Sequence, residues 1–207
     1  MKIAIIDYGL GNLQSIHNAI CYVGADAVIT DSKNEIENAD KIILPGVGAF
    51  QDGMKGLIEK NLVEPLHSSL KKGKPILGIC LGAQLLTQSS EEFVKTEGLG
   101  FIEAETLYLP SDRILIPNTG WINTKLNPCK TIPAWLNNLD WNDAWFYYVH
   151  SLYMKVSNPE LEYAYGVKNN FNVTGIIGIE NLTCIQFHPE KSGENGLRLL
   201  KNYIEKA

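Results

Sequence analysis

The sequence has few of the features that place a protein in a membrane, on a nucleic acid or around a metal. No run approaches the roughly 18 apolar residues of a transmembrane helix, and the apolar run at the start stops at Asp7, too short for a signal peptide. Lys and Arg do not cluster with interleaved aromatic residues, and the net charge is -5. We expect a cytoplasmic protein that binds neither nucleic acid nor membrane.

Cysteine is scarce and scattered. No two cysteines form a C-x-x-C pair, so neither a zinc site nor a disulfide framework is predicted, and we expect no metal and no cofactor. In a reducing compartment each cysteine would be a free thiol, and the commonest role of such a residue is a small buried apolar side chain. The four are Cys21, Cys80, Cys129 and Cys184.

The first half of the chain alternates short β-rich runs with amphipathic ones. With 207 residues, 45% of them hydrophobic, the chain can bury one core, and we expect a single domain over 1–207. The β-α-β-α order predicts an α/β fold with a mostly parallel central sheet and helices on both faces. Strands are expected at 2–8, 25–30, 41–44 and 75–79, and helices at 13–23, over 49–70 with a break or first turn at Pro65, and from Leu81 onward.

The second half shows short β-rich runs with turn signals and no helical period before residue 193. We expect these strands to be antiparallel or mixed additions to the same sheet. A surface loop is expected at 127–143, between two of the strands, and a last helix is expected at 193–206. The expected strands are 113–116, 121–126, 146–156, 163–167, 174–179 and 183–187.

One cysteine stands at a predicted junction of strand and helix. The pentapeptide Gly78-Ile79-Cys80-Leu81-Gly82 is the thiol counterpart of the G-x-S-x-G nucleophile elbow, in which flanking glycines allow a sharp turn. The N–H groups of the following helix favour a thiolate. Taken alone, the pentapeptide fits a packed structural cysteine equally well.

A second motif lies more than a hundred residues further on. His188 and Glu190 flank Pro189, which fixes the backbone between them. A cysteine nucleophile needs a histidine to take its proton, and the histidine needs an acceptor that sets its tautomer. In combination with the elbow cysteine, the two residues favour a catalytic interpretation over a solvated loop.

The run Pro45-Gly46-Val47-Gly48 follows the third predicted strand. A glycine-rich turn there exposes backbone N–H groups at the carboxyl edge of the sheet, where α/β proteins place their sites. Such donors would suit the oxyanion of a tetrahedral intermediate. The run is not a phosphate loop, because no Gly-Lys-Ser/Thr follows, and as an isolated motif it also fits an ordinary turn.

Together these segments resemble the triad-type (class I) glutamine amidotransferases, and the similarity is greatest to the glutaminase subunits of imidazole glycerol phosphate synthase. The matching strings run in the family's order over nearly the whole chain, at 5–13, 44–50, 78–86, 147–151 and 186–192.

The resemblance implies hydrolysis of L-glutamine by a cysteine thioester. Cys80 would attack the side-chain amide, and His188 would protonate the leaving ammonia and then activate water, with Glu190 orienting it. The oxyanion would be bound by backbone at Gly46, Val47, Gly48 and Leu81, in a strand that needs reorienting when the partner's site is occupied. The amino-acid end of the substrate would be held by Gln84, Glu92, Ser151 and Leu152.

The sequence departs from the family at Pro117–Ile122. The family shows Pro-His-x-Gly-Trp-Asn there, and this chain has Asn118 and Ile122 in place of its His and Asn. That region lies near the subunit interface in the family, as do positions matching Asn12, Trp121 and Lys191.

Because of this departure, the sequence does not decide the identity of the partner that accepts the ammonia. A TIM-barrel cyclase of histidine biosynthesis is expected, and a sugar amidotransferase of surface-glycan assembly is the alternative. A cysteine hydrolase or peptidase on a similar sheet is a further alternative, although it would not need Gln84 and Glu92.

Overall fold

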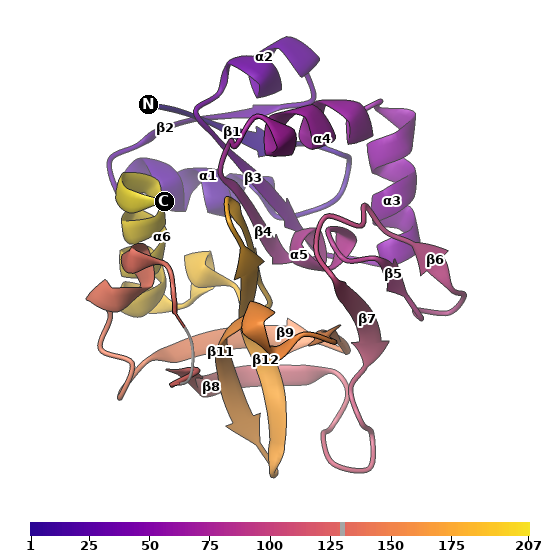
Figure 1. Cartoon of the computed structure of the whole chain (residues 1–207), viewed down its shortest axis with the longest axis vertical. Coiled ribbons are helices and arrows are strands. Elements are labelled where there is room, and N and C mark those ends of the chain that lie inside the picture. Colours follow the sequence, from indigo (N-terminus) through magenta and orange to yellow (C-terminus); the bar gives the residue numbers. More distant parts are fainter. Residues whose placement is uncertain (129–130) are drawn as a thin grey trace.

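The computed structural model of the chain describes residues 1–128 and 131–207, so Cys129, expected to be a free thiol, lies outside the described residues. A nine-stranded sheet runs through the molecule in the order β2-β1-β3-β4-β13-β12-β11-β8-β9, and a four-stranded sheet in the order β10-β7-β5-β6 lies beside it (Figure 1). The predicted α/β class, with a mixed sheet and covering helices, is confirmed.

Five strands form the parallel part of the large sheet, and every pairing among them is parallel. Three of the five are buried along their whole length, as expected for strands that are covered on both faces. The five are β1 (Lys2–Ile6), β2 (Asp26–Thr30), β3 (Lys41–Gly46), β4 (Ile76–Cys80) and β13 (Leu182–Ile185).

Side chains alternate between two apolar clusters along these strands. In β1, Ile3 and Ile5 pack with α1 (Leu13–Tyr22) and α6 (Gly193–Lys206), whereas Ala4 and Ile6 pack on the opposite side. The helices on that opposite side are α2 (Lys33–Asn38), α3 (Phe50–Glu59), α4 (Val63–Lys71) and α5 (Leu81–Leu85). Among the described residues, no helix is both long and apolar enough to cross a membrane.

The predicted helical stretch 49–70 is two helices, with Pro65 in the first turn of α4. The break falls at Asn61, whose φ of 56° is left-handed and cannot continue a helix. The helix expected from Leu81 onward is only five residues long, and α2 was not predicted.

The remaining strands of the large sheet pair antiparallel. They are β12 (Phe171–Ile179), β11 (Glu162–Lys168), β8 (Asn118–Leu126) and β9 (Trp145–His150). The second sheet contains β5 (Ser89–Ser90), β6 (Thr96–Glu97), β7 (Ala104–Tyr108) and β10 (Leu152–Val156). Within the described residues, three 3-10 helices complete the fold: η1 (Ala134–Asn138), η2 (Pro159–Leu161) and η3 (Pro189–Lys191).

Three expectations about the second half are wrong. The single strand expected at 146–156 is two strands, β9 and β10, which are separated at Ser151 and belong to different sheets. The strands of the second half therefore do not all add to one sheet. The strand expected at 113–116 is a turn, because the N–H groups of Arg113 and Ile114 both donate to the carbonyl of Pro110. The expected surface loop at 127–143 is partly core, since η1 buries Trp135 against Tyr203 of α6.

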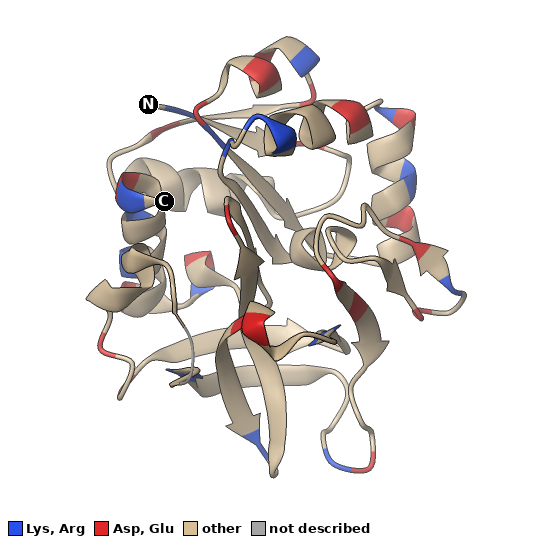
Figure 2. Ribbon diagram, in the orientation of Figure 1, with Lys and Arg blue, Asp and Glu red and all other residues tan. Residues whose placement is uncertain are grey.

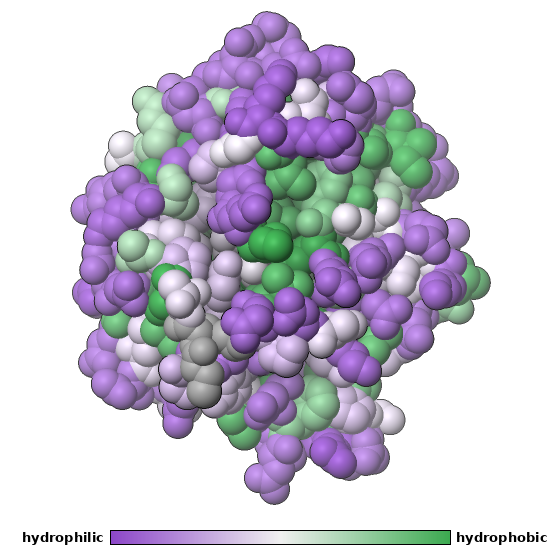
Figure 3. Space-filling model, in the orientation of Figure 1, coloured by the Kyte–Doolittle hydropathy of each residue, from purple (hydrophilic) through white to green (hydrophobic). Residues whose placement is uncertain are grey.

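The surface is polar over most of its extent. Figure 2 shows charged residues on the outer helices and loops, while the strands carry few of them. Figure 3 shows hydrophilic residues around the rim of the same face and an apolar patch near its centre.

The turn from β4 into α5 is packed too tightly for side chains at two positions. A methyl group at Gly82 would overlap the carbonyl of Leu44 in β3, and one at Gly78 would lie 2.6 Å from the Cα of Ala83. These two glycines therefore let α5 approach the sheet closely enough to hold the turn in place.

We predict that Gly82→Ala lowers the free energy of unfolding by about 3 kcal/mol, because the overlap is with backbone that cannot move aside. Urea denaturation measures the change. Gly24→Ala is the matched control: its φ is 91° with no atom within 4 Å of the added methyl, so only strain remains, worth about 1–2 kcal/mol. Equal losses in the two variants would contradict the packing argument.

Candidate active site

Cys80 is the last residue of β4 and directly precedes α5. Its φ of 52° and ψ of -114° place a non-glycine residue in the left-handed half of backbone space, a strained conformation that clusters at functional sites. The predicted elbow is therefore present as a backbone geometry. The thiol is 6% exposed, so it reaches solvent only at one side.

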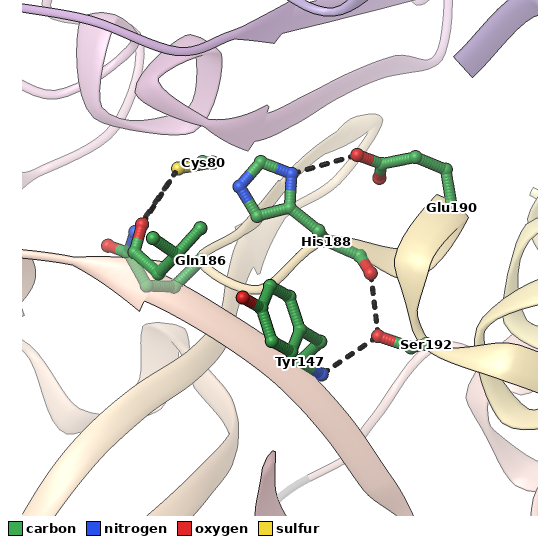
Figure 4. A network of polar contacts seen from close by, with 7 residues as sticks. Cys80, Tyr147, Gln186, His188, Glu190 and Ser192 are labelled. Atoms are coloured by element: carbon green, nitrogen blue, oxygen red, sulfur yellow. Dashed lines mark hydrogen bonds and ion pairs between the residues drawn. The ribbon is translucent and has the colours of Figure 1, made fainter. Parts of the chain in front are cut away.

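His188 and Glu190 come from the loop and 3-10 turn after β13. The Nδ1 atom of His188 lies 2.8 Å from Oε1 of Glu190, and both side chains are almost fully buried. Since the carboxylate can only accept, the ring proton lies on Nδ1. Figure 4 shows the imidazole between Cys80 and Glu190, with its other nitrogen facing the sulfur. That Nε2 atom has no hydrogen-bond partner among the described residues.

The backbone of His188 is held on both sides. Its N–H donates to the carbonyl of Tyr147 over 2.9 Å, and the Ser192 hydroxyl donates to its carbonyl over 2.6 Å. The same hydroxyl accepts from the N–H of Tyr147 over 2.9 Å (Figure 4). These bonds tie the backbone of His188 to β9, and the bond to Glu190 orients the ring.

The surroundings change the acidity of His188. Burial lowers its pKa, but the interactions with Cys80 and Glu190 outweigh burial and raise the pKa to about 9. The interaction with Cys80 contributes most to this increase, and Figure 4 shows the sulfur facing the Nε2 atom. A protonated imidazole beside the sulfur is the arrangement that stabilises a thiolate.

A cavity of about 290 Å³ opens beside Cys80. This volume is at the small end of ligand pockets and suits an amino acid. The four residues predicted to hold the substrate all line it, although they come from distant segments of the chain. They are Gln84, Glu92, Ser151 and Leu152.

Gln84 and Glu92 are both held by hydrogen bonds. The Nε2 atom of Gln84 lies 3.2 Å from the carbonyl oxygen of Leu152 and 3.2 Å from Oε1 of Gln186. Glu92 accepts a 2.6 Å hydrogen bond from the N–H of Phe50, the first residue of α3, and presents a carboxylate to the cavity. Gln84 is buried rather than exposed on the surface of its helix.

The residues predicted to bind an oxyanion line two spaces, the cavity beside Cys80 and a narrow crevice next to His188. Val47, Gly48 and Leu81 line the cavity, and Gly48 has a φ of 125°. Gly46 pairs with Cys80 across β3 and β4 and lies in a narrow crevice behind it, next to His188. The oxyanion role of these groups stays a prediction.

The three predicted interface residues lie around the same site. Asn12 and Lys191 are exposed, and Asn12 borders the crevice that contains His188 and Glu190. Trp121 is 52% exposed, and its ring lies 5.9 Å from that of Tyr147. Their contact with a partner stays a prediction.

Sequence reasoning missed some of the residues around the site. Gln186 places its Nε2 atom 4.0 Å from the sulfur of Cys80, and Ser192 anchors the backbone of His188. Both lie within the string 186–192 that carries the resemblance, which was the available signal. His150 is also buried and lines the cavity.

Comparison with known proteins agrees with this geometry. A family model described as "Glutamine amidotransferase class-I" matches residues 4–207. Solved structures match at low identity, including a glutamine amidotransferase (TM-score 0.73, 17% identity, 98% of this chain and 97% of that one) and PurLQS from Thermotoga maritima (TM-score 0.77, 16% identity, the same coverage). The chain belongs to the class I glutamine amidotransferase family and is an enzyme of that class, as its sequence predicted.

Curated relatives narrow the comparison further. Three that bear the name imidazole glycerol phosphate synthase subunit HisH, or HisH 1, come from Caldanaerobacter subterraneus, Legionella pneumophila and Bacillus cereus. They are 43%, 40% and 43% identical, and the alignments cover 98%, 99% and 97% of this chain and 97%, 99% and 93% of those proteins.

We predict that Glu190→Gln lowers the pKa of His188 from about 9, because the charge and the acceptor at Nδ1 weaken together. Histidine resonances followed by NMR across a pH titration measure it. Glu92→Gln is the control, since that carboxylate bonds to Phe50 instead, and it should leave the midpoint unchanged.

The sign of this shift also fixes a pH dependence of stability. A histidine whose pKa is raised in the folded protein stabilises the fold fully when the pH is below the pKa that the residue has in the unfolded chain, about 6.5. This contribution is lost as the pH rises from that value to the folded-state pKa of about 9. Titration of His188 at or below its unfolded value in the wild type would contradict the site geometry.

Proposed function

We propose that this chain is the glutaminase subunit of imidazole glycerol phosphate synthase, hydrolysing glutamine and passing the ammonia to a cyclase in histidine biosynthesis. The names of the relatives agree with this function, which the sequence also predicted. The observation that carries the chemistry is the alignment of Cys80, His188 and Glu190 beside a cavity of amino-acid size.

The proposed reaction has two halves. The thiolate of Cys80 attacks the side-chain amide carbon of glutamine, and the C–N bond breaks as His188 gives its Nε2 proton to the leaving ammonia. The resulting γ-glutamyl thioester is attacked by water, which loses its proton to the same Nε2 atom, and glutamate and the thiolate are regenerated. Glu190 keeps the ring oriented and stabilises the imidazolium in both halves.

Substrate orientation follows from the charges around the cavity. Glu92 offers a carboxylate to the ammonium of glutamine, and Gln84 with the backbone of Ser151 and Leu152 would hold the rest of the amino-acid end. A cavity of about 290 Å³ suits one amino acid better than an extended peptide. This size argues against the peptidase alternative.

The oxyanion site would be formed by the backbone around Val47 and Gly48, with Leu81. Because Gly48 is a glycine with a φ of 125°, the preceding peptide can rotate at little cost. We propose that binding of the partner's ligand reorients this segment, so that the isolated subunit is a poor glutaminase.

The partner is proposed to be a TIM-barrel cyclase that docks around Asn12, Trp121 and Lys191 to form a heterodimer. The two departures from the family motif do not oppose this, because Asn118 and Ile122 are buried and present no altered surface. The relatives' names favour the cyclase over the sugar amidotransferase. A cytoplasmic location and a single domain over 1–207 stay predictions.

We predict that Cys80→Ala, assayed with the cyclase, lowers glutamine-dependent turnover by at least about 1,000-fold, because no thioester can form. Turnover with added ammonium salts should stay within about twofold of the wild type, because only ammonia delivery is lost.

Cys184→Ala is the matched control. This residue is buried in β13, pairs with Gly78 and does not line the cavity, so glutaminase activity should persist. Retained glutamine use by Cys80→Ala would contradict the mechanism. Glutaminase activity that no cyclase stimulates, but a sugar amidotransferase does, would overturn the proposed pathway.

A further inference from the structure

A line of polar groups, buried except at its outer end, leads away from the cavity through four strands. Lys168 of β11 donates from Nζ to Oδ1 of Asn118 in β8 over 2.6 Å. Nδ2 of Asn118 lies 2.8 Å from Nε2 of His150 in β9, and Nδ1 of His150 lies 2.6 Å from the carbonyl oxygen of Leu152 in β10. Asn118 is 1% exposed and His150 is 6% exposed, so the two bonds of His150 are shielded from water, whereas Lys168 at the outer end is half-buried.

The direction of every bond in this line is determined by its ends. An ammonium group can only donate, so Lys168 fixes the oxygen of the Asn118 amide on its own side and turns the NH₂ group toward His150. A carbonyl oxygen can only accept, so the carbonyl of Leu152 requires a proton on Nδ1 of His150. His150 is therefore the Nδ1–H tautomer, and its Nε2 atom accepts from Asn118.

The line ends at the wall of the proposed glutamine pocket. His150 and Leu152 flank Ser151, where the chain passes from one sheet to the other, so the bond between them spans this break. The Leu152 carbonyl also accepts from Gln84, which in turn bonds to Gln186 beside Cys80. The shape of the wall thus depends on the proton position at His150.

The surroundings also keep this histidine uncharged. Burial lowers its pKa to about 4; the hydrogen bond to Leu152 opposes the shift, and the positive charges of His188 and Lys168 add to it. At neutral pH the wall next to Ser151 carries no positive charge that would repel the ammonium group of an amino acid.

We propose, on the basis of the proposed glutaminase function, that Asn118 and Lys168 are positioning residues for substrate binding: they fix the tautomer of His150, and through it the Ser151–Leu152 wall that receives glutamine. Neither residue touches the substrate. Asn118, one of the two residues that depart from the family motif, is the central link, so this departure has a function inside the subunit.

The test is Asn118→Asp in the complex with the cyclase. The carboxylate has the size of the amide and still accepts from Lys168, but its second oxygen cannot donate to Nε2 of His150. That nitrogen must then take a proton, and a positive charge appears in the pocket wall. We expect the KM for glutamine to rise at least about tenfold while kcat changes less than about threefold, because ground-state binding is lost.

One control and one further variant separate this effect from damage to the fold. Asn172→Asp introduces the same charge at an exposed position of β12 and should leave the KM unchanged. Lys168→Met frees the amide of Asn118 to rotate and should raise the KM about threefold, with kcat unchanged. Turnover with added ammonium salts should be normal in all three variants.

The protonation state of His150 distinguishes the proposed role of Asn118 from a purely structural one, because a purely structural role would leave that state unchanged in the variant. Nitrogen-15 NMR at neutral pH should show one protonated ring nitrogen, Nδ1, in the wild type and two in Asn118→Asp. A wild-type Nε2–H tautomer, or an unchanged KM in Asn118→Asp, would overturn the inference while leaving the glutaminase assignment intact. A wild-type complex that does not hydrolyse glutamine would instead overturn the proposed function.

Discussion

The parallel pairing of β13 with β4 is the contact on which the rest of the site depends. It aligns Cys184 with Gly78 and Ile185 with Ile79, although more than a hundred residues separate the two strands in the sequence. Because parallel strands end at the same edge of a sheet, the residues after β13 must emerge beside the elbow after β4. The approach of His188 to Cys80 is therefore a consequence of strand register, and Glu190 follows one residue beyond Pro189.

Tight packing at the elbow holds Cys80 in its strained conformation. Gly78 and Gly82 let α5 lie directly against β3 and β4, and no side chain could be added at either position without overlap. Backbone strain of this kind persists only where the surroundings over-determine it. The same packing places Gln84, one turn after Cys80, where it can reach the Leu152 carbonyl.

Sequence patterns predicted the structure where one short segment encodes a whole strand or turn. The first four parallel strands and the elbow were predictable, because each of these strands is a short apolar run that ends in glycine or a turn. The strand near 183–187 was expected only as an antiparallel or mixed addition, so its parallel pairing with β4 was not predicted. The switch of sheets at Ser151 was not predictable, because residues 146–156 keep one β-rich pattern across it. The strand at 104–108 was not predicted, and the turn at 113–116 was expected to be a strand. Only burial shows that Ile114 turns inward while Leu115 stays exposed. The line from Lys168 to Leu152 depends on the register of β11, β8 and β9 and on the change of sheet at Ser151, which sequence alone does not supply.

The central claim is that the elbow cysteine forms a covalent bond with the substrate and the other cysteines do not. The most direct measurement is mass spectrometry of the rapidly quenched complex during glutamine turnover, followed by mapping of the modified peptide. The account predicts a glutamyl group on Cys80 alone, lost once glutamine is exhausted. Turnover without any adduct, or an adduct on Cys21 or Cys184 in place of Cys80, would contradict it.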